Sequence, residues 1–171
     1  MQVASCQLPA DALLGRYADD GGFTDCYHAD LDQPVTLDRY VEAFYCGGLI
    51  RIERLLIGMF LSRPSSRLQV RQLARGQIDG FAAWRVEARN ETQLLLCDVS
   101  GRTRSWLMVQ SRPETHAGSR LYFGSAVVPS RRDASGQPRM GWLFGALLGF
   151  HRLYSRLLLK AASRRLLRGG A

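Results

Sequence analysis

The residues of this chain that could do chemistry are its histidines and cysteines, but their spacing forms no complete reactive set. His28, His116 and His151 are the three histidines, and they lie far apart in the sequence. Cys26 and His28 are two residues apart, so on a strand both side chains would face the same way, and a thiolate–imidazole pair is chemically conceivable. No glycine loop that could bind an oxyanion follows them, so we assign no catalytic residues.

The four cysteines, Cys6, Cys26, Cys46 and Cys97, contain no C-x-x-C pair. No His/Cys/Asp cluster has the spacing of metal ligands, so we expect neither a metal nor a cofactor. Three of the four thiols lie in or beside apolar runs, where a free cysteine behaves as a small hydrophobic residue. Unpaired cysteines are typical of the cytoplasm, which is the location we expect.

Aromatic residues give the best candidates for binding a ligand. Seven side chains could line a pocket between a sheet and the C-terminal helix: Trp84, Arg104, Trp106, Tyr122, Trp142, Phe150 and His151. The alternative for the aromatic residues is plain core packing. An inward-facing Arg104 would need an acid such as Glu53 or Glu87, or the anionic head group of a ligand. A solvated Arg104 beside a hairpin turn is the interpretation we favour.

A basic row marks the end of the chain. Five cations recur every four residues and so lie along one side of a helix: Arg152, Arg156, Lys160, Arg164 and Arg168. Neighbouring like charges at this spacing repel by about 0.2–0.5 kcal/mol per pair. The row could contact an anionic membrane surface or an acidic protein, or the acids in residues 11–42 could neutralise it. No RNA-binding signature accompanies it, which argues against a nucleic-acid partner.

Charge is unevenly distributed over the 171 residues. Residues 1–60 hold nine Asp/Glu and four Arg, a net charge of −5, whereas residues 61–171 hold nineteen Lys/Arg and six Asp/Glu, a net charge of +13. Such asymmetry is compatible with an anionic partner. The length and the 46% hydrophobic content predict one folded domain over residues 1–171. Within it we expect an N-terminal extension over residues 1–22 and a connecting loop over 129–138.

A long C-terminal helix must position many of these residues. Residues 140–168 read as one helix, preceded by Pro138 and ended by Gly169. Its apolar side chains at steps of three and four predict one buried face: Leu143, Leu147, Phe150, Tyr154, Leu157 and Ala161. The longest apolar run, residues 140–150, is too short to span a bilayer, so no transmembrane segment is expected.

The shorter elements precede this helix. A short helix over residues 10–17 is followed by a strand over 23–31. Three further helices are expected at residues 37–45, 49–60 and 64–75. A period of two then predicts four strands joined by short turns, at residues 81–88, 92–98, 102–110 and 120–128. The predicted fold class is α+β: an antiparallel sheet of about five strands gripping a long C-terminal helix, with two or three short helices after the first strand.

This order of elements resembles the helix-grip architecture of the START-like, polyketide-cyclase-like (SRPBCC) superfamily. Short motifs are similar to those of small uncharacterised bacterial families in that group: Ala43-Phe44, Asn90-Glu91 before Leu94-Leu95-Leu96, and Phe150-His151-Arg152-Leu153. The resemblance implies an apolar cavity for a hydrophobic ligand between the sheet and the last helix. It implies no particular chemistry.

Three functional hypotheses follow. The first is a cytoplasmic domain that binds a hydrophobic small molecule or lipid in that cavity. The second is a peripheral interaction module that places its basic helix on an anionic membrane or an acidic protein. The third is a cyclase- or hydrolase-type enzyme, for which the sequence offers no recognisable catalytic set.

Overall fold

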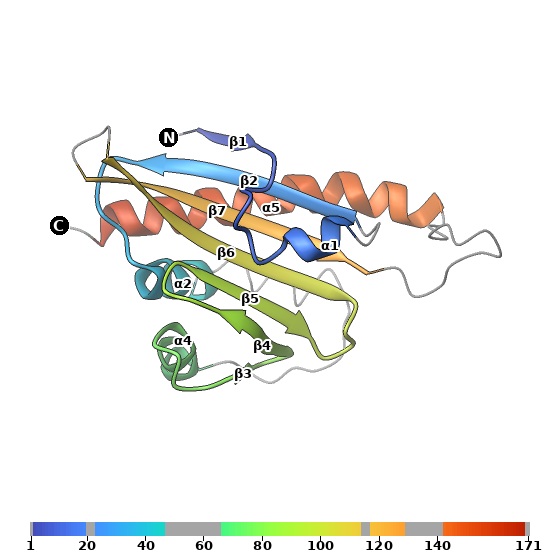
Figure 1. Cartoon of the computed structure of the whole chain (residues 1–171), viewed down its shortest axis with the longest axis horizontal. Helices are drawn as coiled ribbons and strands as arrows, with labels where there is room; N and C mark the ends of the chain where they lie inside the picture. The colour runs from blue at the N-terminus through green and yellow to red at the C-terminus, as the bar shows by residue number, and fades with distance from the viewer. Residues whose placement is uncertain (1, 20–22, 47–65, 114–116, 129–141, 170–171) are drawn as a thin grey trace.

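In the described part of the chain, one antiparallel sheet lies between three helices on one face and the N-terminal segment on the other (Figure 1). The computed structural model describes residues 2–19, 23–46, 66–113, 117–128 and 142–169, and in the last helix it describes side chains from His151 onward. The described strands are β1 (Val3–Ser5), β2 (Phe23–Leu31), β3 (Gly80–Phe81), β4 (Trp84–Arg89), β5 (Gln93–Asp98), β6 (Thr103–Arg112) and β7 (Gly118–Val127). The described helices are α1 (Gly15–Asp19), α2 (Leu37–Tyr45), α4 (Arg67–Ala74) and α5 (Trp142–Arg168).

The predicted α+β class, with an antiparallel sheet and a long C-terminal helix, is confirmed, but the sheet has seven strands rather than about five. The additional strands, β1 and β3, hold three and two residues at the two edges of the sheet. Strands this short carry no detectable period of two, so the sequence does not reveal them. The helix predicted over residues 49–60 and the loop predicted over 129–138 lie outside the described residues, as do Glu53 and His116.

The strand order is β1-β2-β7-β6-β5-β4-β3, and all neighbouring strands are antiparallel. Strands β4 to β7 form the predicted meander. Strand β2 pairs with β7 along its whole length, from Phe23 opposite Val127 to Leu31 opposite Ser119. This pairing joins the first long strand to the last one and brings distant parts of the chain together.

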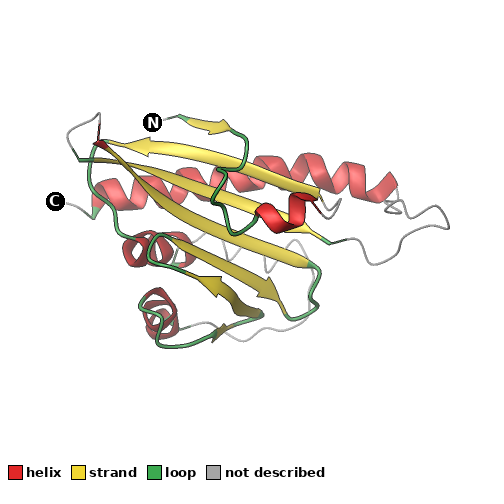
Figure 2. Ribbon diagram, viewed as in Figure 1, coloured by secondary structure: helices red, strands yellow, loops and turns green. Residues whose placement is uncertain are grey.

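Both faces of the sheet are apolar and covered. The inner face, which is the one toward α2, α4 and α5, carries Tyr27, Ala29, Leu31, Leu94, Leu96, Leu107, Val109, Leu121 and Phe123. The opposite, outer face carries Cys26, Leu95, Trp106, Met108, Tyr122 and Ala126. The N-terminal segment crosses the outer face (Figure 2), and residues 6–17 pack on these side chains. When both faces are buried, polar and apolar residues no longer separate along a strand.

The short helices on the inner face begin close to where the sequence predicted them. Helix α2 has the predicted bounds. The residue before it, Thr36, donates its hydroxyl hydrogen to the Asp38 carboxylate and caps no backbone N–H. Helix α4 begins after Ser66, which forms a capping box with Gln69. On the outer side, α1 begins at Gly15, later than the helix predicted from residue 10.

Helix α5 packs against β1, β2 and β7 and also against α2. Its buried side is formed by Ser155, Leu158, Leu159, Ala162, Ser163 and Leu166. The predicted apolar face is wrong in this half of the helix, because Leu157 is exposed and Tyr154 and Ala161 are only half-buried. Leucines occur on several sides of α5, and serine or alanine occupies three buried positions, so a search for an apolar stripe selects the wrong side.

Candidate functional site

The structure does not bring the seven predicted pocket residues together. Trp106 and Tyr122 belong to the outer face, where residues 6–17 cover them. Arg104 lies on the same face, with its guanidinium 4.6 Å from the ring centre of Tyr17. These three side chains therefore cannot line a pocket between the sheet and α5.

The other four members of the predicted set lie elsewhere. Trp84 is half-buried and packs against the inner cluster from the β3–β4 edge. His151 lies between α5 and the inner face, where it contacts Ser125. Of Trp142 and Phe150 only the backbone, in the first half of α5, is described.

Trp106 attaches the N-terminal segment to the sheet. Its indole Nε1 donates to Gln93 Oε1 over 2.9 Å, and the backbone N–H of Leu13 donates to the same oxygen over 2.9 Å. Gln93 Nε2 in turn donates to the carbonyl of Asp11 over 3.0 Å. The buried amide of Gln93 thus satisfies groups from both layers, and Trp106 serves as core here.

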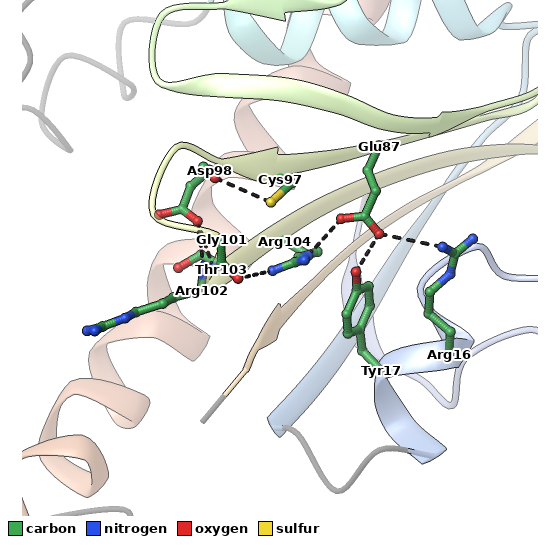
Figure 3. A network of polar contacts seen from close by, with 9 residues as sticks. All are labelled: Arg16, Tyr17, Glu87, Cys97, Asp98, Gly101, Arg102, Thr103 and Arg104. Carbon is green, nitrogen blue, oxygen red and sulfur yellow. Dashed lines mark hydrogen bonds and ion pairs between the residues drawn. The ribbon is translucent and has the colours of Figure 1, made fainter. Parts of the chain in front are cut away.

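Arg104 is not surrounded by solvent, as the sequence suggested, but has the acid partner that the alternative interpretation named. Its Nε donates to Glu87 Oε2 over 2.9 Å, and its side chain is only 12% exposed. Tyr17 donates its hydroxyl hydrogen to the same carboxylate, and Arg16 lies 3.6 Å from it (Figure 3). Burial raises the pKa of Tyr17, and the hydrogen bond to Glu87 raises it further. The network joins α1 to β4 and β6.

Two open depressions lie near this network, away from α5. The larger, of about 520 Å³, is lined by Asp79, Arg85, Val86, Glu87, Cys97, Gly101 and Arg104. Two acids and two arginines line it, so their charges balance, and Glu87 and Arg104 already neutralise each other. Burial raises the pKa of Cys97, which disfavours a reactive thiolate there. The smaller depression, of about 420 Å³, lies beside Trp84 and Phe81.

A polar cluster of three residues lies between the inner face and α5. Asp25 is on β2, Ser125 is opposite it on β7, and His151 is on α5. Ser125 donates to Asp25 Oδ1 twice, from its hydroxyl over 2.6 Å and from its backbone N–H over 3.0 Å. His151 Nε2 lies 2.6 Å from Ser125 Oγ and 3.5 Å from Asp25 Oδ2. Sequence reasoning named only His151, because its partners are 100 residues apart and belong to no motif.

The cluster contains a serine, a histidine and an acid, but its hydrogen bonds do not activate the serine. The Ser125 hydroxyl donates its hydrogen to Asp25, so its oxygen accepts from Nε2–H of His151. In a hydrolytic triad the nearer histidine nitrogen accepts the serine hydrogen, while the acid holds the other ring nitrogen. Here Asp25 and Ser125 share one ring nitrogen, an arrangement suited to binding rather than to nucleophilic attack.

Two buried side-chain oxygens at this interface lack a hydrogen-bond partner among the described residues. They are Asp25 Oδ2 and Ser155 Oγ, and Ser155 lies one turn after His151 on the buried side of α5. The side chain of Asp25 is only 7% exposed. Burial raises the pKa of the neighbouring Tyr27 to about 12, with a further contribution from the charge of Asp25. Buried polar atoms are nearly always satisfied, so the interface offers an acceptor to a bound molecule or water.

The basic row lies along the solvent side of α5. Its arginines are exposed and Lys160 is half-buried. Arg152 and Arg156 lie 6.0 and 5.4 Å from the ring centres of Phe23 and Tyr27. Within the described part of the chain, no ion pair connects the row to an acid in residues 11–42. Neutralisation by those acids, which was the alternative interpretation, has no support there.

Exposed leucines interrupt the row. Leu153, Leu157 and Leu167 are 57%, 41% and 47% exposed. On a helical projection they fall between the cations of the row rather than on a separate side. We call this combined surface, made of the basic row and these three leucines, the basic helix surface.

Residues that could hold a metal ion do not gather anywhere in the described ranges: no group of three or more His, Cys, Asp or Glu has suitable geometry. Among the described helices, none is long and apolar enough to cross a membrane.

No protein-family model, no curated protein and no solved structure matches the chain.

Proposed function

We propose that this protein is a helix-grip binding domain that holds a hydrophobic molecule between the inner face of the sheet and the first half of α5. The observation that carries the proposal is the buried Oδ2 of Asp25, which has no hydrogen-bond partner among the described residues and lies in a mainly apolar sheet–helix interface. A hydrophobic ligand site typically combines apolar walls with a few polar groups that orient the ligand. The proposal takes the protein to be cytoplasmic, which its four free cysteines favour.

The polar cluster specifies the polar end of the ligand. Asp25 Oδ1 already accepts two hydrogen bonds from Ser125, whereas Oδ2 lies 3.5 Å from His151 Nε2 and has no hydrogen-bond partner among the described residues. A ligand with a hydroxyl or amine group at one end would satisfy Oδ2. Its apolar part would then extend along the inner face toward the start of α5.

Substitution of Asp25 by Asn tests this site, because Asn keeps the oxygen that Ser125 needs and turns Oδ2 into an N–H donor. We expect native mass spectrometry of the gently purified protein to detect a bound hydrophobic molecule in the wild type. Titration with pyrenebutanol, a hydrophobic fluorophore with one hydroxyl, should give about ten- to hundredfold weaker binding to Asp25→Asn, as expected for a lost charge-assisted hydrogen bond. The exposed Asp79→Asn is the matched control. Equal affinity of all three proteins, or no binding by the wild type, contradicts the proposal.

A second candidate function is docking of the basic helix surface on an anionic membrane. Exposed leucines among regularly spaced cations favour it, since a purely solvated helix face gains nothing from three exposed leucines. Each basic residue close to an anionic bilayer contributes about 1 kcal/mol. The leucines would enter the head-group region while the arginines bind lipid phosphates.

Vesicle flotation tests the docking surface. The wild type should float with vesicles that contain phosphatidylglycerol and remain unbound with phosphatidylcholine alone. Arg156→Glu combined with Arg164→Glu should weaken binding about thirtyfold or more, because two favourable charges are reversed. Leu153→Asn should also weaken it, which distinguishes a membrane from an acidic protein partner. The control pair Arg75→Glu and Arg85→Glu lies on exposed positions away from α5. Flotation that is equal in all variants, or absent from the wild type, refutes docking.

A further inference from the structure

Two cysteines from different parts of the chain meet at the β1–β2 edge. The Sγ atoms of Cys6 and Cys26 are 3.1 Å apart, and neither thiol is in a disulfide. The S–S bond of a disulfide is about 2.0 Å long, so a movement of about 1 Å separates the two states. The sequence did not reveal this pair, because it depends on the three-residue strand β1.

The backbone holds the two cysteines opposite each other. Strand β1 pairs with β2 from Val3 opposite Ala29 to Ser5 opposite Tyr27, and the next backbone N–H, that of Cys6, donates to the carbonyl of Cys26 over 3.0 Å. Cys6 stands at the end of β1, where the chain leaves the sheet to cross the outer face. It can therefore adjust its position more easily than Cys26, which lies in the interior of β2.

The two thiols differ in exposure and in charge environment. Cys6 is half-buried, whereas Cys26 is only 5% exposed. The hydrogen-bonded contact with the Cys26 thiol lowers the pKa of Cys6, and His28 and Arg120 lower it further against the opposing effect of partial burial. The hydrogen bond to Cys6 and burial raise the pKa of Cys26. One half-buried thiol that ionises readily beside one buried thiol that does not is the distribution expected of an attacking and a resolving cysteine.

His28 adds an independent observation. It lies two residues after Cys26 on the outer side of β2, and its Nδ1 is buried without a hydrogen-bond partner among the described residues. The ring of Tyr122 lies 6.2 Å from the His28 ring, and Arg120 on the same strand pairs with Asp30. The sequence predicted that Cys26 and His28 face the same side of a strand. The structure adds the thiol of Cys6 to that side.

We propose that Cys6 and Cys26 form a reversible dithiol–disulfide pair that is oxidised by small-molecule disulfides. This inference is independent of the ligand site, because the pair lies on the outer side of the sheet and the polar cluster on the inner side.

The exchange proceeds in two balanced steps. The thiolate of Cys6 attacks one sulfur of the small disulfide, forms a mixed disulfide and releases one small thiolate, which takes up a proton. The buried Cys26 then loses its thiol proton to solvent and attacks Cys6 Sγ, which closes the Cys6–Cys26 bond and releases the second small thiol. Two protein thiols are oxidised and one small disulfide is reduced to two thiols. The largest cause of the raised pKa of Cys26, its hydrogen bond to Cys6, disappears once Cys6 is in the mixed disulfide.

The bond would fix the start of the segment that covers the outer face, which we call the outer cover (residues 6–17), to β2. Residues 7–17 follow Cys6 directly, and their apolar side chains belong to the same cluster as Trp106 and Tyr122. A disulfide at this point restrains their detachment, so the redox state would set how firmly the outer face is covered.

Incubation of the full chain with oxidised glutathione, followed by mass spectrometry of the intact and digested protein, tests the proposal. The wild type should lose the mass of two hydrogens and yield a peptide linked through Cys6 and Cys26. In Cys26→Ser the glutathione adduct should accumulate at Cys6, whereas Cys6→Ser should show neither the link nor an adduct at the buried Cys26. Cys46→Ser is the matched control, since Cys46 is also half-buried but burial raises its pKa.

Alkylation rates measured at neutral pH provide a second readout that requires no oxidation. Cys6 should react with iodoacetamide about tenfold faster than Cys46, because each unit of lowered pKa gives up to ten times more thiolate. Circular dichroism confirms that the serine variants fold, and Cys26→Ala replaces Cys26→Ser if the hydroxyl is not tolerated. Glutathione adducts without a Cys6–Cys26 link in the wild type, or equal reaction rates for Cys6 and Cys46, overturn the proposal.

Discussion

At the scale of single residues, buried and half-buried polar groups join segments that lie far apart in the chain. Gln93 connects the N-terminal segment to Trp106, and Asp30 connects β2 to β7. The Asp30 carboxylate accepts from Nε and Nη2 of Arg120 over 2.6 and 2.8 Å, and Arg112 adds a cation at 3.5 Å. This two-pronged geometry gives the ion pair more energy than an isolated surface contact would have.

The Asp30–Arg120 pair predicts a pH-dependent loss in Asp30→Asn. The hydrogen bond from Arg120 is the main cause that lowers the pKa of Asp30 below its ordinary value of 3.8. A lowered folded-state pKa stabilises the protein above the unfolded-state value and loses this effect as the pH falls through the folded-state value. Asp30→Asn should therefore lower the free energy of unfolding by about 1 kcal/mol at neutral pH and by less near pH 3.

Urea denaturation at the two pH values measures this difference. Asp32→Asn, at an exposed position just after β2, provides the control and should leave the midpoint unchanged at both pH values. A loss in Asp30→Asn of equal size at both pH values would show that packing, and not the carboxylate charge, stabilises this position.

At the scale of elements, the outer cover depends on one close contact in β7. A Cβ atom added to Gly124 would lie 2.9 Å from the Asp25 carbonyl oxygen, from Leu14 Cδ2 and from Trp106 Cε3. The backbone oxygen cannot rotate away, so β2 and β7 or the covering segment would have to move. Gly124 is thus the position where strand pairing and the outer cover meet.

Gly124→Ala should lower the free energy of unfolding by about 1–3 kcal/mol, the usual cost of forcing a methyl group into a filled core. Gly15→Ala is the matched control, because a Cβ there meets nothing within 4 Å. Thermal and urea denaturation of both variants measure the effect. If both substitutions are equally tolerated, Leu14 does not pack on the sheet in the manner described.

The elements that the sequence predicts are those with enough residues to show a period. Residues 37–45 form α2 as predicted, and the four strands of the meander appear in the predicted order. The short edge strands and the buried side of α5 are not predictable in this way, because β1 has three residues and α5 carries leucines on several sides. The sequence also did not show on which face of the sheet Trp106 lies, since both faces are apolar.

The candidate site was predictable only in part, for a related reason. His151 could be named because it is one of three histidines, and Glu87 because Arg104 needed an acid. Asp25 and Ser125 become neighbours only through the β2–β7 pairing, and Cys6 and Cys26 only through β1. A single sequence carries no signal for pairings between strands so far apart.

At the scale of the whole molecule, a few ion pairs join the acidic and the basic half of the chain, but none of those described involves the basic row. Acids of the first half pair with arginines of the sheet and of α4: Glu42 with Arg71, and Asp30 with Arg112 and Arg120. Among the described residues, no cation of the row forms an ion pair with any of these acids. This leaves the positive charge of the last segment on one surface, which is the physical basis for the docking candidate.

The N-terminal segment completes the second hydrophobic layer of the molecule, and this predicts the effect of removing it. Loss of residues 1–19 would uncover Trp106 and Tyr122 and leave the Gln93 amide without its hydrogen bonds to the backbone of Leu13 and Asp11. The truncated chain should unfold several kcal/mol more easily, since burial of one leucine such as Leu14 alone contributes about 2–5 kcal/mol. Exposure of an apolar face of this kind also favours self-association.

Size-exclusion chromatography with light scattering and urea denaturation test this expectation together. The truncated chain should form dimers or larger species, and Leu14→Ala in the full chain should lower the urea midpoint by an intermediate amount without association. The point variant keeps the test decisive if the truncated chain cannot be obtained in folded form. A monomeric truncated chain with an unchanged midpoint, or no effect of Leu14→Ala, would mean that the sheet is stable with its inner cover alone and that residues 2–19 add no stability to it.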